Sequence, residues 1–311
     1  MSKLRFLPLF MVAFLFLACE KDENWMPYGQ FDYSTLEDGI SADTKYYENP
    51  PYPKDADTLR ILAIGNSFST DAMTYMDALV KASGIDANRL CLYETSMGGA
   101  SFDTWTETFH NKSAVALKRI TGGVTMTSQG TLSQLLNQPW DVIVVQQASD
   151  LSYVWSSYAT LREYVELITT TCPNKRVCLA FQLVWSHTPK EMPYVLQGNV
   201  ACCQKMSQRY GIDVIIPTGT AIQLARGTRL NDKSYMTRDN WHLNTGMACY
   251  IASCTWFESL LRPVFGIPIV GNTAKPQNDY QEADILLGQQ CAERAVLQPY
   301  IITEGLSDLQ Q

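Results

Sequence analysis

Three side chains have the types and spacing needed to activate a hydroxyl group as a nucleophile. Ser67 ends the segment Gly65-Asn66-Ser67, which follows an apolar run. His242 follows Asp239 by three residues, and in a turn this spacing lets the carboxylate accept the imidazole Nδ1–H while Nε2 stays free. A neutral imidazole takes a serine proton and passes it to a leaving group, which is acyl-transfer chemistry. We therefore expect the Ser67 oxygen to lie within about 10 Å of His242.

Each of these features also has a structural explanation. Gly, Asn and Ser are common in turns and at helix starts, so Gly65-Asn66-Ser67 could simply join a strand to a helix. Asp239 could cap the turn that follows it, with His242 at the surface or hydrogen-bonded in the core. The other histidines, His110 and His187, have no carboxylate at a comparable spacing. His242 is therefore the candidate base.

The positions of these side chains depend on an alternation of short apolar runs and helical patterns. In the run 59–64 five of six residues are apolar, which suits a strand buried on both faces of a parallel sheet. The alternation predicts an α/β fold with a doubly wound, mostly parallel five-stranded sheet and helices on both faces. The expected strands are 59–64, 89–93, 142–145, 177–181 and 214–216, and the expected helices lie near 71–83, 130–137, 156–171, 193–210, 245–262 and 281–297.

Ser67 would then lie at the carboxyl end of the first strand. In open α/β sheets the loops that leave these strand ends form the crevice where ligands bind. Gly98-Gly99 follows the second expected strand, where glycine either turns backbone N–H groups toward the crevice or simply makes a flexible turn. Gln146-Gln147 follows the third, and burying an amide is costly unless the amide is hydrogen-bonded. Both segments are candidates for stabilising an oxyanion.

These segments, in this order, resemble the SGNH/GDSL hydrolase superfamily. The branch most similar to this sequence is a set of bacterial domains of unknown function found in Bacteroidetes lipoproteins, on the strength of 65–69, 139–147 and 242–244. The resemblance covers residues 59–261 and implies an SGNH/flavodoxin-like three-layer sandwich. It also implies that Ser67 is the nucleophile and donates its own N–H to the oxyanion, with His242 as base and Asp239 as its orienting partner.

Two further oxyanion donors are implied by the resemblance: Gly99, with Gly98 as the alternative, and Gln147. The sequence departs from the superfamily pattern at two positions. Asn66 stands where Asp is usual, and Gln147 stands where the superfamily has Asn. If the longer Gln147 side chain does not reach the oxyanion, the barrier rises by about 3 kcal/mol.

The resemblance also implies a function, together with the N-terminal segment described below. It implies a serine esterase that removes acyl groups, acetyl in particular, from a carbohydrate substrate. The alternative is a catalytically weak glycan-binding surface lipoprotein on the same fold. Four tryptophans lie in or near loops at the strand ends and either form a platform for sugar rings or belong to the core, namely Trp105, Trp155, Trp185 and Trp241.

The N-terminus has the pattern of a bacterial lipoprotein signal peptide over residues 1–18. Lys3 and Arg5 precede an apolar run, 6–18, that is short for a bilayer span. The run ends in Ala18 before Cys19, which resembles a lipobox and predicts lipidation at Cys19; cleavage elsewhere is the alternative. The acidic segment 20–23 resembles the export tag of Bacteroidetes surface lipoproteins. We therefore expect an outer membrane lipoprotein at the cell surface of a Bacteroidetes-type bacterium, held to the membrane through Cys19.

Composition limits the partners and cofactors. The 311 residues are 46% apolar, enough to bury the core of one large α/β domain. A net charge of −7 without a basic run argues against nucleic acid as a partner. Nine cysteines without a CxxC pair, and only three histidines, argue against a metal site, and most cysteines are expected to be buried. We therefore expect no cofactor.

The sequence divides into four parts. These are the signal peptide 1–18, a tether 19–58, a hydrolase-like domain 59–265 and a C-terminal extension 266–311 packed on that domain.

Overall fold

Seven strands form one mixed sheet at the centre of the protein. The computed structural model describes residues 51–52, 57–122, 127–187 and 192–300. The strand order is β4-β3-β2-β1-β5-β6-β7, in which β2, β1, β5, β6 and β7 run parallel while β3 and β4 form an antiparallel edge. The strands are β1 (Leu59–Gly65), β2 (Leu90–Ser96), β3 (Ala114–Arg119), β4 (Thr127–Thr131), β5 (Val142–Val145), β6 (Cys178–Gln182) and β7 (Val214–Ile216).

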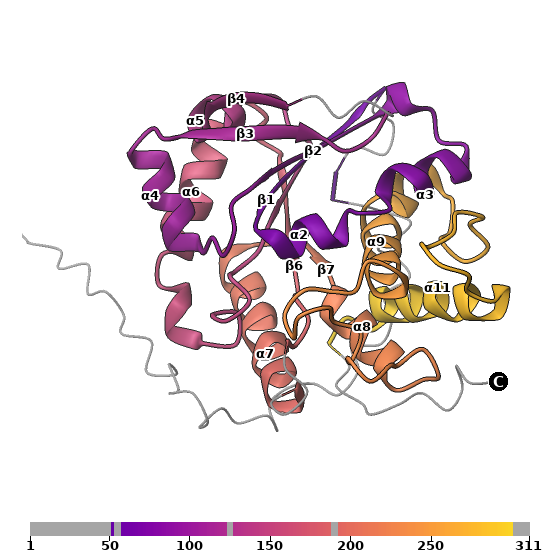
Figure 1. The fold of residues 1–311 in the computed structure, drawn as a ribbon. Coiled ribbons are helices and arrows are strands. Elements are labelled where there is room, and N and C mark those ends of the chain that lie inside the picture. Colours follow the sequence, from indigo (N-terminus) through magenta and orange to yellow (C-terminus); the bar gives the residue numbers. More distant parts are fainter. Residues whose placement is uncertain (1–50, 53–56, 123–126, 188–191, 301–311) are drawn as a thin grey trace, which may run out of the picture.

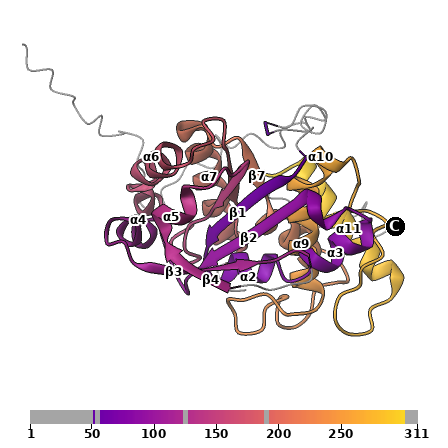
Figure 2. The same ribbon diagram turned by 90° about the horizontal axis from the view of Figure 1, so that it is seen from above.

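Helices cover both faces of this sheet, as Figures 1 and 2 show. Leu59, Ile61 and Ala63 of β1 pack with α2, α3, α8, α9 and α11, whereas Leu62 and Ile64 pack with α4 to α7 on the opposite face. Successive residues of β1 therefore face helices on opposite sides, and the sheet is the middle layer of a three-layer sandwich. The helices are α2 (Ser67–Ala72), α3 (Met76–Ser83), α4 (Phe102–His110), α5 (Leu132–Leu136), α6 (Leu161–Thr171), α7 (Met192–Tyr210), α8 (Thr218–Arg226), α9 (Met247–Leu260), α10 (Arg262–Phe265) and α11 (Glu282–Leu297), with short 3₁₀ helices η2 (Ala87–Arg89) and η3 (Trp155–Tyr158).

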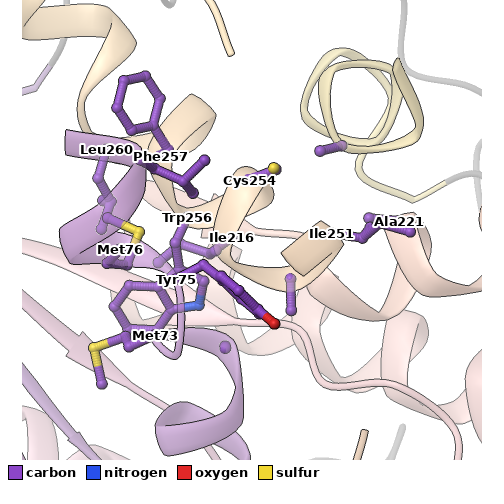
Figure 3. Close-up of a cluster of buried hydrophobic side chains, with 14 of the residues drawn as sticks. Met73, Tyr75, Met76, Ile216, Ala221, Ile251, Cys254, Trp256, Phe257 and Leu260 are labelled. Atoms are coloured by element: carbon purple, nitrogen blue, oxygen red, sulfur yellow. The ribbon is translucent and has the colours of Figure 1, made fainter. Parts of the chain in front are cut away.

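Every residue of α9 is buried, because this helix lies between the sheet and the C-terminal segment. Trp256 and Phe257 of α9 point into the apolar cluster drawn in Figure 3, together with Met73 and Met76. The indole N–H of Trp256 donates to Gln182 Oε1 at 3.0 Å, which anchors α9 to the carboxyl end of β6. Helix α11 packs on α9 and α8. The segment just before α9, which carries Asp239 and His242, is therefore joined to a fully buried element.

The strand order places the crevice beside Ser67. Ile61 of β1 is in register with Val142 of β5, so the carboxyl ends of these two strands lie side by side. From β1 the chain adds β2 on one side of the sheet, and it later adds β5, β6 and β7 on the other side of β1. The order in which strands are added therefore reverses at β1, and open α/β sheets bind ligands at such a point. Ser67 follows β1 and Gln146 follows β5, so both lie at this point.

The expected α/β architecture is confirmed, but the sheet has seven strands and not five. All five expected strands are present, and they are the five parallel ones. Strands β3 and β4 were not predicted. They lie at the edge of the sheet, where β4 has no apolar side chain and the short apolar run of β3, 114–117, is followed by Lys118 and Arg119. The expected helix 71–83 is divided into α2 and α3, and helices α4 and α8 were not predicted.

The N-terminal predictions lie outside the described residues: the signal peptide 1–18, Cys19 and most of the tether 19–58. Among the residues that are described, no helix combines the length and apolar character needed to cross a bilayer. The eight described cysteines are free thiols, and all except Cys91 are buried, as expected.

Candidate active site

Ser67, His242 and Asp239 form a continuous chain of hydrogen bonds. The Ser67 Oγ lies 2.8 Å from His242 Nε2, and His242 Nδ1 lies 2.7 Å from Asp239 Oδ2. Ser67 is the first residue of α2, whereas Asp239 and His242 belong to the loop between α8 and α9. The fold thus brings together two segments that are 175 residues apart in the chain. The distance between Ser67 and His242 lies well inside the expected limit of about 10 Å.

Asn66 fixes the turn that presents Ser67. Its side-chain oxygen accepts the N–H of Phe68 at 2.9 Å and so caps α2. Its side-chain amide donates to the carbonyl of Ala100 at 3.1 Å, which ties the loop after β2 to the start of α2. Because Ser67 is the first residue of the helix, its N–H has no hydrogen-bond acceptor within the helix.

The Asp239 carboxylate holds both the turn and the imidazole. Its Oδ1 accepts the backbone N–H groups of Trp241 at 3.0 Å and His242 at 2.7 Å, while Oδ2 receives the imidazole Nδ1. Partial desolvation acts to raise the pKa of Asp239, but the hydrogen bonds from His242 and Trp241 outweigh it and lower the pKa to about 2. The carboxylate is therefore ionised at any ordinary pH and orients the imidazole with Nε2 toward Ser67.

A second carboxylate, on α2, anchors the loop that carries His242. Asp71 lies one helical turn after Ser67 and is almost fully buried. It receives the Arg238 guanidinium on both oxygens, at 2.9 and 3.1 Å, and accepts the N–H of Leu243 at 2.9 Å. The same guanidinium donates to the Leu243 carbonyl. Burial raises the pKa of Asp71 even though the contacts with Arg238 act to lower it. Neither residue was singled out from the sequence, because their partnership joins segments far apart in the chain.

Gly99 lies in the loop after β2, next to the turn that presents Ser67. Its φ is +67°, a left-handed conformation that favours glycine, whereas Gly98 has no such requirement. The neighbouring Ala100 carbonyl accepts the Asn66 amide, so this loop is held against the nucleophile turn. Of the two glycines, Gly99 is therefore the one whose backbone conformation the loop requires.

Gln147 differs from expectation, because its side-chain amide is used within the fold. Its Nε2 donates to the carbonyl and the hydroxyl of Ser157, at 2.7 and 3.1 Å. Its Oε1 accepts the N–H groups of Phe102 and Ala148. The Gln147 side chain, longer than that of Asn, reaches Ser157 in η3. Gln147 therefore links η3 to the start of α4, and both of its amide N–H bonds are used within the fold and not available to an oxyanion. The amide beside the nucleophile turn is that of Gln146, which donates to Asn66 Oδ1.

The other two histidines have different surroundings. His110 on α4 contacts Glu163 of α6 at 2.7 Å on the surface. His187 is buried and its ring stacks on the indole of Trp241. Among the described residues, no group of three or more His, Cys, Asp or Glu side chains is arranged to hold a metal ion.

Comparison with known proteins identifies one family. The model of DUF4886, described as a domain of unknown function, matches residues 60–293. The crystal structure of a DUF4886 family protein from Bacteroides uniformis is 31% identical to the chain and covers 82% of it and 100% of that protein, with a TM-score of 0.72. No curated protein matches.

Two more distant solved structures are similar in part. LAE5, described as an α/β hydrolase enzyme from the metagenome of Lake Arreo, is 11% identical over 66% of this chain and 96% of its own, with a TM-score of 0.47. A catalytic mutant of Axe2, an acetylxylan esterase from Geobacillus stearothermophilus, is 10% identical over 68% and 97%, with a TM-score of 0.46.

Replacing Asp71 with Asn should loosen the loop that carries His242. The variant leaves the Arg238 guanidinium without its carboxylate, and we expect the free energy of unfolding to fall by about 2 kcal/mol in urea titrations. Hydrogen exchange at the Leu243 amide, which donates to Asp71, should become faster. Glu166→Gln, which removes an exposed ion pair with Arg162 on α6, is the control and should cost less than about 1 kcal/mol. Equal effects of the two variants would contradict the anchoring role.

Proposed function

The chain belongs to the DUF4886 family, whose function is unknown, so we propose an activity from its own site: a serine esterase that removes acyl groups, acetyl in particular, from a carbohydrate. The observation that carries this proposal is the hydrogen-bonded chain Ser67–His242–Asp239, with distances of 2.8 and 2.7 Å. This arrangement of nucleophile, base and orienting carboxylate recurs on unrelated folds and is recognised by its geometry. The resemblance of the motifs to SGNH/GDSL hydrolases supports the same proposal.

In the proposed mechanism Ser67 Oγ attacks the ester carbonyl while its proton moves to His242 Nε2. Asp239, ionised and hydrogen-bonded to Nδ1, stabilises the imidazolium. The tetrahedral intermediate collapses, the C–O bond to the sugar breaks, and the leaving oxygen takes the proton from His242. Water then attacks the acyl-enzyme with His242 again as base, and this releases the carboxylic acid and regenerates Ser67.

Two backbone groups serve as oxyanion donors in this proposal, the N–H of Ser67 and the N–H of Gly99. Gln147 does not contribute while its amide is bound to Ser157. Losing one oxyanion donor costs about a hundred- to a thousandfold in kcat, so turnover is expected to be modest. The same observation favours the second candidate function, a catalytically weak glycan-binding lipoprotein.

The sugar component of the substrate rests on the resemblance and on the lipoprotein-like N-terminus. An acidic chain with net charge −7 and no basic run suits a neutral substrate better than an anionic one. A surface lipoprotein would meet extracellular glycans.

Ser67→Ala should abolish both labelling and turnover. We expect the wild-type protein to react with a fluorophosphonate probe and to hydrolyse p-nitrophenyl acetate, because both need the activated hydroxyl. Release of acetate from acetylated xylan, pectin and sialoglycans then identifies the carbohydrate. If the wild-type protein neither labels nor turns over while it still binds glycans, the esterase proposal is wrong and the binding lipoprotein is favoured.

Asp239→Asn should lower kcat by about a hundredfold, less than for a fully buried carboxylate because half of the Asp239 side chain is exposed. The Asp239 pKa of about 2 lies below its usual value of 3.8, so its stabilising effect is present above that value and is lost only as the pH falls toward 2. Because Asp239 stays ionised above about pH 4, its protonation should add no step to the wild-type kcat/KM profile between about pH 7 and 4. A protonation step in this range that is present in the wild type and absent from Asp239→Asn would contradict the role given to Asp239, and Glu166→Gln should match the wild type.

We also propose that Cys19 is lipidated and holds the protein to the outer membrane. The apolar run 6–18 ends in Ala18 before Cys19, and a lipid chain there anchors a protein without a spanning helix. Cys19→Ser should move the full-length protein from the membrane fraction to the soluble fraction and remove the acyl mass from its N-terminal peptide. An unchanged distribution would refute the anchor, and Cys91→Ser is the matched control.

A further inference from the structure

We propose that Trp241 is the platform on which the sugar ring of the substrate stacks, an inference that rests on the proposed esterase function. Six tryptophans lie in the described residues, and five of them are buried. Three of the four that were candidates for a sugar platform belong to the core: Trp105, Trp155 and Trp185. Trp241 is 38% exposed, and it directly precedes His242 in the chain.

The exposed indole is held in place from one side. The imidazole of His187 stacks under it with ring centroids 4.1 Å apart and an angle of 7° between the planes. His187 is itself buried, and the ring of Tyr153 packs against it at 5.9 Å. This stacking fixes the orientation of the indole. Covering its remaining exposed surface with a ligand would stabilise the complex in proportion to the apolar area removed from water.

The backbone of Trp241 is fixed by the same residues that build the candidate active site. Its N–H donates to Asp239 Oδ1 at 3.0 Å, and its carbonyl accepts the indole N–H of Trp185 at 2.8 Å. Trp185 in turn stacks on Phe68 at 4.0 Å, and Phe68 follows Ser67. The platform and the nucleophile are thus parts of one packed unit, which reduces the ordering cost of binding.

The shape and surroundings of the indole favour a sugar over an acyl chain or a membrane. The only other large apolar side chain that is exposed in the described part of the chain is Leu286, on α11. A lipid surface or a long acyl chain needs a broad apolar area, which a single ring does not supply. A pyranose offers a flat C–H face that fits one aromatic ring, and its hydroxyl rim suits the exposed polar residues Asp239 and Asn240 beside it.

The position of the indole assigns it to the leaving group. His242 Nε2 receives the Ser67 proton and must then deliver it to the departing oxygen, so the alcohol part of the ester lies on the His242 side. Trp241 adjoins His242, so it contacts the sugar and not the acyl group. Removing the indole should therefore impair hydrolysis of a sugar ester more strongly than hydrolysis of an ester of a small alcohol.

The test compares Trp241→Ala, Trp241→Phe and the wild type on two substrates, acetylated xylan and ethyl acetate, with acid release followed at constant pH. We expect Trp241→Ala to lower kcat/KM for acetylated xylan about tenfold more than kcat/KM for ethyl acetate, with the extra loss mainly in KM. Trp241→Phe should recover most of the loss. Leu286→Ala is the matched control, because Leu286 on α11 is similarly exposed (41%), and this variant should behave as the wild type.

The outcomes separate this inference from the esterase proposal. If the wild type hydrolyses ethyl acetate and Trp241→Ala affects both substrates equally or neither, the platform is wrong and the esterase stands. If the wild type hydrolyses neither ester, the esterase proposal fails, and calorimetric binding of acetylated xylan, pectin and sialoglycans decides the platform. Binding by Ser67→Ala that is lost in Ser67→Ala/Trp241→Ala supports it, and the same binding by both variants, or by neither, overturns it.

Discussion

The packing of the 237–243 loop against α2 is the interaction on which the site depends. Helix α2 supplies Ser67 and, one turn later, Asp71, and both contact that loop. A single neutral hydrogen bond between Ser67 and His242 contributes only about 1 kcal/mol, too little to order a loop. The charge-assisted bonds from Arg238 to Asp71, and the bond from the Leu243 N–H, supply the rest. The geometry at the nucleophile is therefore set largely by a carboxylate that has no part in the proposed chemistry.

The tight end of β1 imposes a second constraint. A Cβ on Gly65 would lie 2.3 Å from Ser69 Oγ and 3.2 Å from Gln146 Cδ, so only glycine fits where the strand passes directly into α2. Asn66 uses its side chain to cap α2 and to hold the loop after β2. The structural and chemical explanations of Gly65-Asn66-Ser67 are thus not alternatives, because the contacts that cap the helix are the ones that present the hydroxyl.

The same double use occurs at Asp239. One oxygen caps the turn through the N–H groups of Trp241 and His242, and the other binds the imidazole. Asn240 lies between Asp239 and Trp241 with φ +67°, a conformation that asparagine tolerates better than most residues and that tightens the turn. A short loop therefore carries the orienting carboxylate, the base and the exposed indole together. This explains how one surface segment can combine proton transfer with recognition.

Local sequence determined the parallel strands, the turn that presents Ser67 and the pairing of Asp239 with His242. Each of these depends on residues close together in the chain, through hydrophobic periodicity or turn geometry. Tertiary structure decided the antiparallel pairing of the edge strands β3 and β4, of which β4 has no apolar side chain, and the partnership of Asp71 with Arg238. It also decided that Gln147 turns to Ser157 while Gln146 turns to Asn66, since adjacent residues after a strand point to opposite sides. Finally, it decided which indole stays in solvent, because the burial of Trp105, Trp155 and Trp185 depends on neighbours supplied by distant elements that no local pattern specifies.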